Sequence, residues 1–410
     1  MNTVTTADRS TTTSRPGRPA SRRAAPAIVA LALGSFAIGT NEFVSMGLLP
    51  EITRGVGVDI PTGGHLISAY ALGVVIGAPV IAALGTRLPR RRLALGLMVA
   101  FLLGNALTAL APNYGTLLLA RLVVGLPHGA YFGVASLIAA SLVPPAVRGR
   151  AVSSVMLGLA VANVAGVPAA TWLGQHLGWR AGYWSVVVIA ALTVLSVLLL
   201  VPPTPASSGA GVRTELAALR RPQVLLTLLV GVVGFGGMFA MYSYIAPTVT
   251  EVAGAGSGFV PVVLLVFGLG GVGGTALGGR LADRALFPSL AGAGAAMGAA
   301  LALMLVAAHS AASLVLAVFA VATAGSVLVV CLQMRLMEVA GDAQMLGAAL
   351  NHSSLNLANA LGAWLGGLVI AAGEGYTAPS LVGAGLSVLG LAALGVSATL
   401  RRRERRTAAA

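Results

Sequence analysis

The sequence predicts an all-α integral membrane protein, with twelve transmembrane helices in two pseudo-symmetric six-helix bundles. Three observations support this fold class. Of the 410 residues, 57% are hydrophobic and only 9% are charged, whereas soluble domains carry about 25% charged residues. Apolar stretches of about 20 residues, the length that crosses a bilayer, recur from Ala27 to Leu400. Finally, the second half of the chain repeats features of the first.

The apolar stretches are separated by short breaks that contain polar residues, proline or glycine. We expect the first stretch to be an uncleaved spanning helix rather than a signal peptide, because many further spans follow it. The predicted spans are 27–49, 63–85, 93–111, 116–140, 151–173, 181–201, 223–246, 259–280, 288–308, 312–334, 344–371 and 379–399.

The repeat appears when the chain is shifted by 197 residues. This shift superimposes Gly73 and Gly77 on Gly270 and Gly274, always at equivalent points of the two halves. Such a duplication is typical of transporters in which two bundles rock about a central site. We predict bundles at 27–201 and 223–400, a cytoplasmic linker at 202–222, a disordered cytoplasmic tail at 1–26 and a basic cytoplasmic tail at 401–410. The first 25 residues also have the composition of an organellar transit peptide.

The arginines predict the orientation in the membrane. With the N-terminus inside, 22 of the 25 arginines lie on the cytoplasmic side, Arg54 and Arg180 lie outside, and Arg121 lies within a span. Cytoplasmic loops carry an excess of basic residues. We therefore expect a multi-pass protein of the cell (inner or plasma) membrane with both termini in the cytoplasm.

The sequence lacks several signatures of nucleotide, metal and catalytic sites. It contains no lysine, so it cannot form the loop whose lysine contacts nucleotide phosphates. The G-x-G-x-x-G pattern at 268–273 follows no predicted strand and lies inside a span, so we reject a dinucleotide site. The five histidines and Cys331 show no metal-ligand spacing. We expect no enzyme activity, cofactor or metal, and, since the arginines follow the membrane, no nucleic-acid partner.

Glu42 is the only acidic residue well inside a predicted span, and Arg121 is a basic residue inside another. Each lies about 10 to 12 Å from the outer end of its span, so the two side chains should have similar depth. An ionisable group in hydrocarbon costs at least about 2.5 kcal/mol and usually marks a functional site. We predict that Glu42 exchanges protons, with a misplaced helix boundary as the alternative. Arg121 either shares in proton coupling or forms a structural ion pair between two helices.

The turns after the second and eighth predicted spans both carry arginine close to glycine. Arginines at such places usually set the topology. Their repetition favours an added role as gating loops that hold the two halves in one conformation. The gating-loop residues are Gly85, Arg87, Arg90 and Arg91 in the first half and Asp283 and Arg284 in the second.

Polar and aromatic side chains on five spans predict a substrate surface. His352, Asn356 and Asn359 share one helical face. These three residues could either line a cavity or pack against other helices. We favour cavity lining, because three polar side chains on a face in contact with lipid would be unfavourable. Aromatic residues of the seventh span would add apolar contacts, with ordinary packing as the alternative. The predicted substrate-binding residues are Asn41, His128, Tyr131, Asn163, Phe235, Met238, Tyr242, Tyr244, His352, Asn356 and Asn359.

Short stretches in both halves match one family. They are Gly39-Thr40-Asn41-Glu42-Phe43, Tyr70-Ala71-Leu72-Gly73, Gly77-Ala78-Pro79, Pro89-Arg90-Arg91-Arg92, Arg121 with Gly125 and His128-Gly129, Gly166-Val167-Pro168, Gly178-Trp179-Arg180, Tyr244-Ile245-Ala246-Pro247 and 356–362. Through them the chain from Leu33 to Leu400 resembles the drug/proton antiporter branch of the major facilitator superfamily. Within it, the chain is most similar to bacterial sugar-efflux-like and chloramphenicol-resistance-like exporters.

This resemblance implies the major facilitator fold and roles for particular residues. It implies that 84–91 is the family's gating loop and that Arg121 is the helix-four arginine linked to proton transfer. Thr86 stands where the gating loop usually has Asp, whereas the second copy retains Asp283. Val167 separates the glycine and proline that are usually adjacent in the antiporter motif. The residues of that motif are Gly158, Gly166, Pro168 and Gly174.

We therefore predict a secondary active transporter that exports a small molecule by proton antiport with alternating access. The substrate would be a drug such as an amphenicol, or a sugar-like metabolite. Uptake or exchange of a sugar or nucleoside is the alternative, and a membrane-embedded sensor with a soluble signalling domain is a third. The expected partners are the substrate, protons and the lipid bilayer, and the chain is expected to be a monomer.

Overall fold

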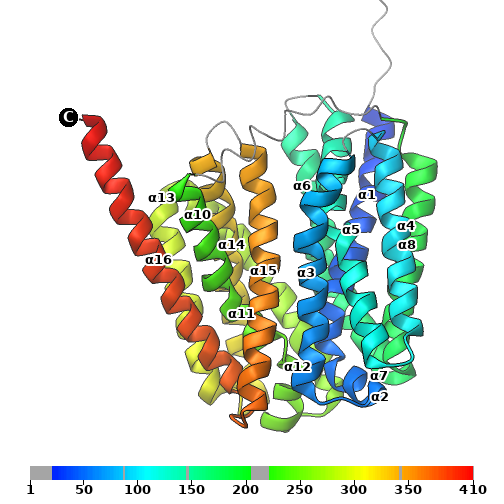
Figure 1. Ribbon diagram of the computed structural model, residues 1–410, viewed down its shortest axis with the longest axis vertical. Coiled ribbons are helices and arrows are strands. Elements are labelled where there is room, and N and C mark those ends of the chain that lie inside the picture. Colours follow the sequence, from blue (N-terminus) through cyan, green and yellow to red (C-terminus); the bar gives the residue numbers. More distant parts are fainter. Residues whose placement is uncertain (1–20, 86–87, 145–146, 205–220, 341–343, 410) are drawn as a thin grey trace, which may run out of the picture.

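The computed structural model describes residues 21–85, 88–144, 147–204, 221–340 and 344–409 (Figure 1). The first half contains α1 (Ser21–Gly47), α2 (Leu49–Val56), α3 (Ile60–Gly85), α4 (Arg90–Leu110), α5 (Tyr114–Ser141), α6 (Arg148–Val161), the π-helix η2 (Ala162–Gly166), α7 (Val167–Leu177) and α8 (Trp179–Leu200). The second half contains α10 (Pro222–Leu229), η3 (Val230–Gly234), α11 (Phe235–Tyr242), α12 (Ile245–Pro247), η4 (Thr248–Val252), η5 (Ser257–Phe259), α13 (Val260–Ala307), α14 (Ala311–Ala340), α15 (Gln344–Ala371) and α16 (Ala378–Ala409).

Within the described residues, eleven helical segments are long and apolar enough to cross a membrane. One of them, 257–307, has 51 residues, more than twice the usual length of about 20. Its backbone leaves helical geometry at Ala285 (φ −159°, ψ 79°). This kink falls between the predicted spans 259–280 and 288–308, so the structure agrees with the predicted twelve-helix fold.

Both ends of the helical region and one short helix differ from prediction. Residues 21–26 were expected in the disordered tail but form the start of α1, and α16 continues to Ala409 through the predicted basic tail. Arginine and alanine dominate both extensions and favour helix, so the helices continue beyond their apolar spans. The short helix α2 was not predicted. Residues 1–20 of the tail and 205–220 of the linker lie outside the described residues.

Glycines hold α3 and α5 together in the first half. A β-carbon at Gly73 would meet the carbonyl oxygen of Leu122, and one at Gly77 would meet that of Leu126, both far inside van der Waals contact. Only glycine allows two helix backbones to approach this closely.

The same contact recurs in the second half between α13 and α14. There Gly270 faces the carbonyl oxygen of Phe319, and Gly274 faces that of Thr323. All four residues are shifted by 197 from their counterparts in α3 and α5. The internal repeat predicted from the sequence is thus confirmed in the helix contacts, and so is the close-packing role of these glycines.

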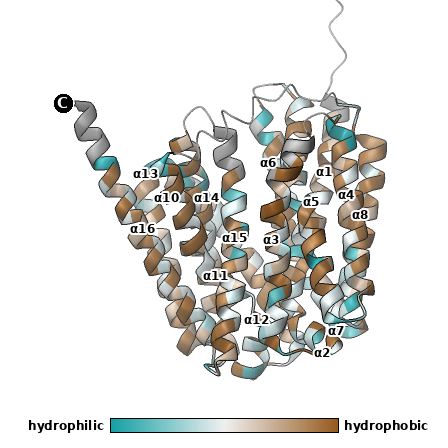
Figure 2. Cartoon of the chain, in the orientation of Figure 1, coloured by the Kyte–Doolittle hydropathy of each residue, from teal (hydrophilic) through white to brown (hydrophobic). Residues whose placement is uncertain are grey.

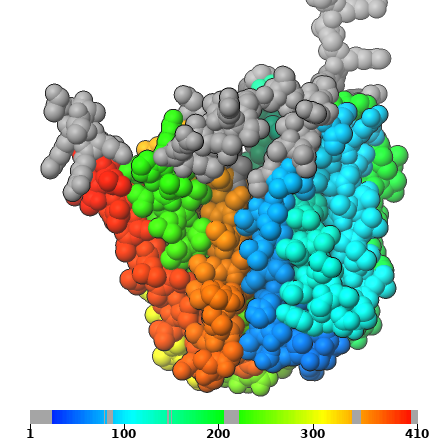
Figure 3. Space-filling model, viewed as in Figure 1, coloured from blue at the N-terminus to red at the C-terminus, as the bar shows by residue number. Residues whose placement is uncertain are grey.

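The two halves meet along α3 and α15, which lie side by side in blue and orange in Figure 3. Here the Ser68 hydroxyl donates to the Ala360 carbonyl at 3.0 Å. We call the end that holds α2 and α12 the lower end, and the end where α1 begins and α16 finishes the upper end, as in Figure 1. Near the lower end, Gln175 Nε2 donates to the Ser257 carbonyl at 2.9 Å, which joins the halves again.

The outer surface of the helices is apolar (Figure 2). Large side chains such as Leu103, Leu199 and Val306 are more than half exposed. In water, an apolar surface of this extent would be unfavourable, whereas in a bilayer it contacts lipid chains.

Candidate functional site

Arg121 lies at the centre of a buried polar cluster in the first half. Its Nη1 donates to Asn41 Oδ1 of α1 at 3.1 Å, and its Nε to the Leu66 carbonyl of α3 at 3.5 Å. The guanidinium lies 4.4 Å from the ring centroid of Tyr70 and 5.7 Å from that of Tyr183. Four helices, α1, α3, α5 and α8, therefore hold this one charge in a fully buried position.

Glu42 follows Asn41 and lies within coulombic range of Arg121. It is 7% exposed and lies inside the candidate span 24–47, so its predicted place within a helix is confirmed. The two residues do not form the ion pair that we considered. In the part of the chain that the structure describes, ion pairs within 4.0 Å join Arg54 to Glu51 and Arg335 to Glu338.

The Arg121 cluster retains spare donors. Among the described residues, Arg121 Nη2 and Asn41 Nδ2 are buried without a hydrogen-bond partner. A buried donor without a partner costs about 1–3 kcal/mol, which a carboxylate or a ligand at this place would recover. The arrangement is therefore suited to bind an acceptor group next to Glu42.

His128 lies two turns further along α5. Its Nδ1 is 2.7 Å from the Tyr70 hydroxyl, and its ring is 5.3 Å from that of Phe132. Phe132 in turn stacks on His352 of α15, at 5.9 Å and 8°. Two predicted binding residues, His128 and His352, are thus linked across the boundary between the halves.

An aromatic cluster lies beside Glu42 on the opposite side of this boundary. Phe43 of α1 is 6.4 Å from Phe239 and 5.7 Å from Tyr242. Tyr242 stacks on Phe267 at 4.0 Å, and Phe235 contacts Phe239 edge to face at 5.4 Å. We use "aromatic cluster" for these five residues. They bring an apolar wall from the second half next to the charged residues of the first.

The polar stripe of α15 is turned inward. Asn356 and Asn359 are buried, Asn356 Nδ2 donates to the His352 carbonyl at 3.0 Å, and both polar atoms of Asn359 lack a partner among the described residues. Met238 is buried as well. This placement favours the predicted inward position of the stripe over contact with lipid.

Two predicted binding tyrosines use their hydroxyls to join helices. Tyr131 of α5 donates to the Leu31 carbonyl of α1 at 3.0 Å, and Tyr244 donates to the Ala363 carbonyl of α15 at 2.6 Å. Both side chains are buried. These bonds favour the packing alternative for Tyr244 and give Tyr131 a packing role as well.

Asn163 lies in η2, where its Oδ1 has no partner among the described residues. Its backbone touches α13 at Gly268, where a β-carbon would meet the Asn163 carbonyl oxygen at 2.5 Å. The glycine pattern at 268–273, which we rejected as a dinucleotide site, therefore serves in part to bring the halves into contact.

The glycines of the antiporter motif pack α6, η2 and α7 against α1. Neighbouring glycines are eight residues apart, and so are their three partners. Two of these partners lie on α1 and the third directly follows its end, so the helices run in register. Pro168 is the second residue of α7, where a missing N–H is tolerated. The contacting pairs are Gly158 with Ala32, Gly166 with Thr40 and Gly174 with Leu48.

The first predicted gating loop connects α3 and α4. Gly85 ends α3, and Arg90 and Arg91 begin α4. Arg91 donates to the Leu198 carbonyl near the end of α8, so it joins two helices of the same half. Arg87 lies outside the described residues.

The second predicted gating loop is a kink rather than a loop. Asp283 and Arg284 lie within α13, directly before the non-helical Ala285. Ser289 donates to the Leu281 carbonyl across the kink at 2.9 Å. The sequence correctly predicted a change of direction here. The chain makes it through one residue with non-helical backbone angles, Ala285, and not through a loop.

A cleft of about 550 Å³ opens at the lower end between the halves. Its lining includes Glu51, Arg54, Asp59 and Glu251. Burial raises the pKa of Glu51, whereas hydrogen bonds from Thr62 lower the pKa of Asp59. We did not predict this cleft, although its three acidic residues all fall in breaks between predicted spans.

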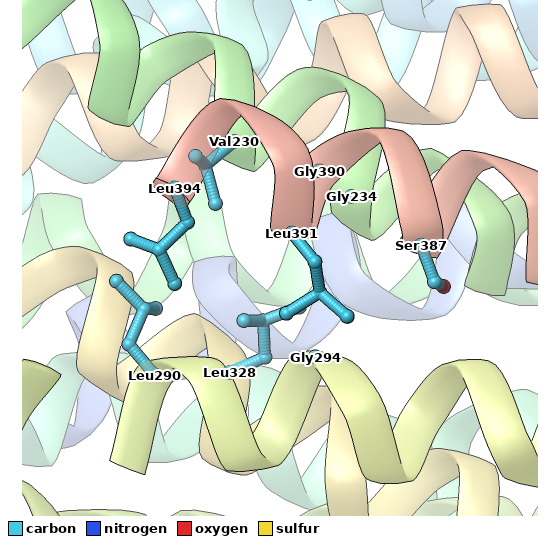
Figure 4. Close-up of a pocket in the computed structure, with 9 residues that line it drawn as sticks. All are labelled: Val230, Gly234, Leu290, Gly294, Leu328, Ser387, Gly390, Leu391 and Leu394. Atoms are coloured by element: carbon cyan, nitrogen blue, oxygen red, sulfur yellow. The ribbon is translucent and has the colours of Figure 1, made fainter. Parts of the chain in front are cut away.

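A second cavity, between η3, α13, α14 and α16, holds only about 10 Å³ (Figure 4). Its lining is apolar except for Ser387, and it is a gap in helix packing rather than a binding site. Neither cavity is lined by a predicted substrate-binding residue. Within the described residues, no three His, Cys, Asp or Glu side chains are grouped closely enough to hold a metal ion.

Comparisons with known proteins agree on one family. The sequence profile of the Major Facilitator Superfamily matches residues 31–346. The inner membrane transport protein YdhP of Escherichia coli O157:H7 is 44% identical over 377 residues, which are 92% of this chain and 96% of that protein. A chloramphenicol resistance protein of Streptomyces lividans is 40% identical over 268 residues, 64% of this chain and 68% of that protein.

A solved structure gives the same fold. The crystal structure of a D-xylose-proton symporter superposes with a TM-score of 0.71, over 90% of this chain and 96% of the symporter. At 18% identity, this likeness concerns the fold alone.

Proposed function

Because this chain belongs to the Major Facilitator Superfamily and is a multi-pass membrane transporter, we propose that it exports a small molecule in exchange for protons. The substrate would be a drug such as an amphenicol, or a sugar-like metabolite. Support for export comes from the relative named as a chloramphenicol resistance protein. The transporter alternates between two conformations as its halves rock about a central site.

One observation carries this proposal: Glu42 lies in the interior of a spanning helix and directly follows Asn41, which binds Arg121. A carboxyl group in this position is costly unless it has a function. It takes up a proton from one side of the membrane and releases it to the other. Asn41, the residue before Glu42, binds Arg121, so proton exchange and substrate binding would take place at one site.

The substrate would bind between the polar residues of the first half and the aromatic cluster of the second. Asn41, with its spare amide donor, and Asn359, without a partner at either polar atom, are suited to bind polar groups. The aromatic rings are suited to bind an apolar ring or chain. This combination fits a neutral molecule that has both kinds of group.

The organisation of the chain supports the same mechanism. The bundles at 27–201 and 223–400 would move against each other, with the gating loops as contacts that open and close. The excess of arginine at the upper end favours a cytoplasmic position for that end and for both termini. One chain supplies both bundles, so a monomer is sufficient.

Uptake or exchange of a sugar or nucleoside is the second candidate. The inward polar stripe of α15 is compatible with it, because hydroxyl-rich substrates need several hydrogen-bonding partners. A membrane-embedded sensor is the third, and it would bind a compound without moving it.

Accumulation of chloramphenicol in cells that express the full chain tests the proposal. We expect low accumulation that depends on the proton gradient and is lost with a protonophore or in Glu42→Gln. Glu374→Gln, an exposed acid between α15 and α16, is the matched control and should export normally. Export that persists in Glu42→Gln contradicts the proton role. Higher accumulation in expressing cells than in empty cells contradicts the direction and favours uptake.

A further inference from the structure

Two arginines of the second half meet at one aromatic ring near the upper end. Arg335 of α14 and Arg401 of α16 have their guanidinium groups 5.8 Å and 5.3 Å from the ring centroid of Phe287, a residue of α13. Three helices therefore bring two positive charges to one place. We call Phe287, Arg335 and Arg401 the basic site.

Arg335 is held firmly within the bundle. Its Nη2 donates to Gln223 Oε1 of α10 at 3.1 Å, and its Nη1 donates to Glu338 Oε2 at 2.9 Å. The Ser397 hydroxyl of α16 donates to the same Gln223 oxygen at 2.7 Å. Arg335 is only 3% exposed, and its Nε has no partner among the described residues. A buried guanidinium with one donor left over is suited to bind a further acceptor.

The basic site has an excess of positive charge. Arg335 has a carboxylate partner, Glu338, whose side chain is 52% exposed. For Arg401, no carboxylate lies within 4.0 Å in the part of the chain that the structure describes. The next residue, Arg402, adds another positive charge at the exposed end of the helix. An anion between the two guanidinium groups would be attracted by both of them.

Helix packing does not require this arrangement. At a shift of 197 residues, Arg335 and Arg401 correspond to Ile138 and Thr204. The helices α3 and α5 nevertheless pack through the same glycine contacts as α13 and α14. In the first half, α8 ends before the position of Thr204, whereas α16 continues past Arg401. The two arginines are therefore additions in the second half that packing does not explain.

The basic site lies at the level of the lipid headgroups. The apolar stretch of α16 ends at Leu400, and Arg401 directly follows it. Arg335 lies five residues before the end of α14, about 8 Å along the helix. With 30 residues, α14 is about 45 Å long, which is the thickness of a bilayer with its headgroups. Both guanidinium groups are therefore within reach of lipid phosphates.

The neighbouring surface favours a lipid over a free anion. On α16, on the membrane side of Arg401, Leu389 and Val396 are 59% and 51% exposed. In a bilayer these side chains contact lipid chains. A phospholipid here would have its acyl chains against α16 and its phosphate beside the arginines. Guanidinium groups bind phosphate oxygens in pairs, and basic pockets between membrane helices are suited to anionic headgroups.

We propose that the basic site binds the phosphodiester headgroup of an anionic phospholipid from the leaflet at the upper end. Arg335, held by Gln223 and Glu338, offers its Nε, and Arg401 binds the phosphate from α16. The lipid thereby joins α16 to α13 and α14 and stabilises the second bundle. This binding goes beyond the proposed transport, because it requires neither Glu42 nor a transported compound.

Native mass spectrometry of the full chain from detergent micelles tests the basic site. Phosphatidylglycerol is the probe, and phosphatidylcholine is the neutral comparison. We expect phosphatidylglycerol to bind more tightly, and Arg401→Gln to raise its dissociation constant roughly tenfold, because one charge-assisted contact to the phosphate is lost. Phosphatidylglycerol should also raise the thermal unfolding temperature of the unchanged chain more than that of Arg401→Gln.

Arg402→Gln is the matched control, because it removes the same charge from the next residue of the same helix. It should change the dissociation constant by about twofold at most. Equal losses in Arg401→Gln and Arg402→Gln would mean general attraction to a basic helix end and would overturn the site. Equal affinity for the two lipids would overturn it as well.

Inorganic phosphate separates the two sources of the anion. If phosphate at millimolar concentration protects the chain from thermal unfolding as well as phosphatidylglycerol does, the site binds a free anion and the lipid assignment is wrong. If Arg401→Gln does not fold, Phe287→Leu tests the same site, since it removes the ring that both arginines contact. It should weaken the binding of phosphatidylglycerol, and unchanged affinity would contradict the proposal.

Discussion

At the positions where the first half has Asn41, Glu42 and Arg121, the second half has Met238, Phe239 and Val318. All six side chains are buried, so both sets lie in the interior. The helix contacts around them are alike, since Gly73 and Gly270 perform the same packing role. The repeat therefore conserves the scaffold, while the chemistry differs between its two copies.

This difference separates the causes of folding from those of function. Charged groups occur at these positions in one copy only, so helix packing does not require them. The apolar set of the second copy reaches back toward the first, since Phe239 stacks near Phe43, the neighbour of Glu42. The two halves therefore present different surfaces to each other. The surface of the first half is suited to bind protons and polar groups, and that of the second half is suited to bind apolar groups.

The largest loss of stability should come from removing Arg121, the buried charge that has no counterpart in the second half. Arg121→Ala deletes two hydrogen bonds and two cation–π contacts, and it leaves the buried Asn41 Oδ1 without its donor. We expect the free energy of unfolding to fall by about 3 kcal/mol or more. Val318→Ala should cost about 1–2 kcal/mol, since it removes packing alone. Thermal unfolding of the full chain in micelles compares them, and equal losses would contradict the asymmetry.

Substituting the packing glycines should reduce stability less than the loss of Arg121, and by a similar amount in both halves. Gly77→Ala and Gly274→Ala each force a β-carbon into a carbonyl oxygen of the neighbouring helix, at a cost of about 1–3 kcal/mol. Gly273→Ala, next to Gly274 but with open space around it, is the control and should not destabilise. Thermal unfolding measures all three. Destabilisation in only one half would show that the repeated contact is not equivalent.

The smallest loss of stability should come from removing a helix cap that is present in the first half and absent from the second. Asp59 Oδ1 accepts from the Thr62 N–H at 2.9 Å at the start of α3, whereas Gly256, its counterpart, offers no side chain to η5 and α13. Asp59→Ala should cost about 0.5 kcal/mol at pH 7, a low value for a cap because Asp59 is exposed to solvent.

The pH dependence of this cap follows from its hydrogen bonds. They hold the Asp59 pKa below its usual value, so the stabilisation is present above that usual value and is lost as the pH falls through the lowered one. The difference in unfolding free energy between Asp59→Ala and the unchanged chain should therefore shrink as the pH falls below the usual aspartate pKa of about 3.9. Unfolding curves at pH 7 and at a series of acidic pH values measure it, and a difference that does not shrink with acidification would contradict a role for the carboxylate.

Much of the fold could be predicted because lipid imposes a simple rule on sequence. Every span needs a long apolar stretch. The spans, the repeat and the position of Glu42 inside a span can therefore be recognised in the sequence alone. Side-chain partners follow no such rule. The bond between Arg121 and Asn41, and the bridge from Tyr70 to His128, join residues 80 and 58 positions apart.

The cleft at the lower end was missed for a related reason. Its lining comes from four separate breaks between spans, and no break contains more than two acidic residues. The short helix α2 was missed because it is amphipathic and too short to cross a membrane. Short polar segments carry little periodic signal, so their structure depends on what they pack against.

By itself, the sequence determined the number and course of the membrane spans, the glycine repeat, and the burial of one acid and one arginine. These follow from hydropathy and side-chain size, which are properties of each residue. Only the tertiary structure decided that Arg121 bonds to Asn41 rather than pairing with Glu42, and that Tyr70 joins it to His128. Partners are selected by small differences in distance and angle between helices, and hydrogen bonds depend steeply on both.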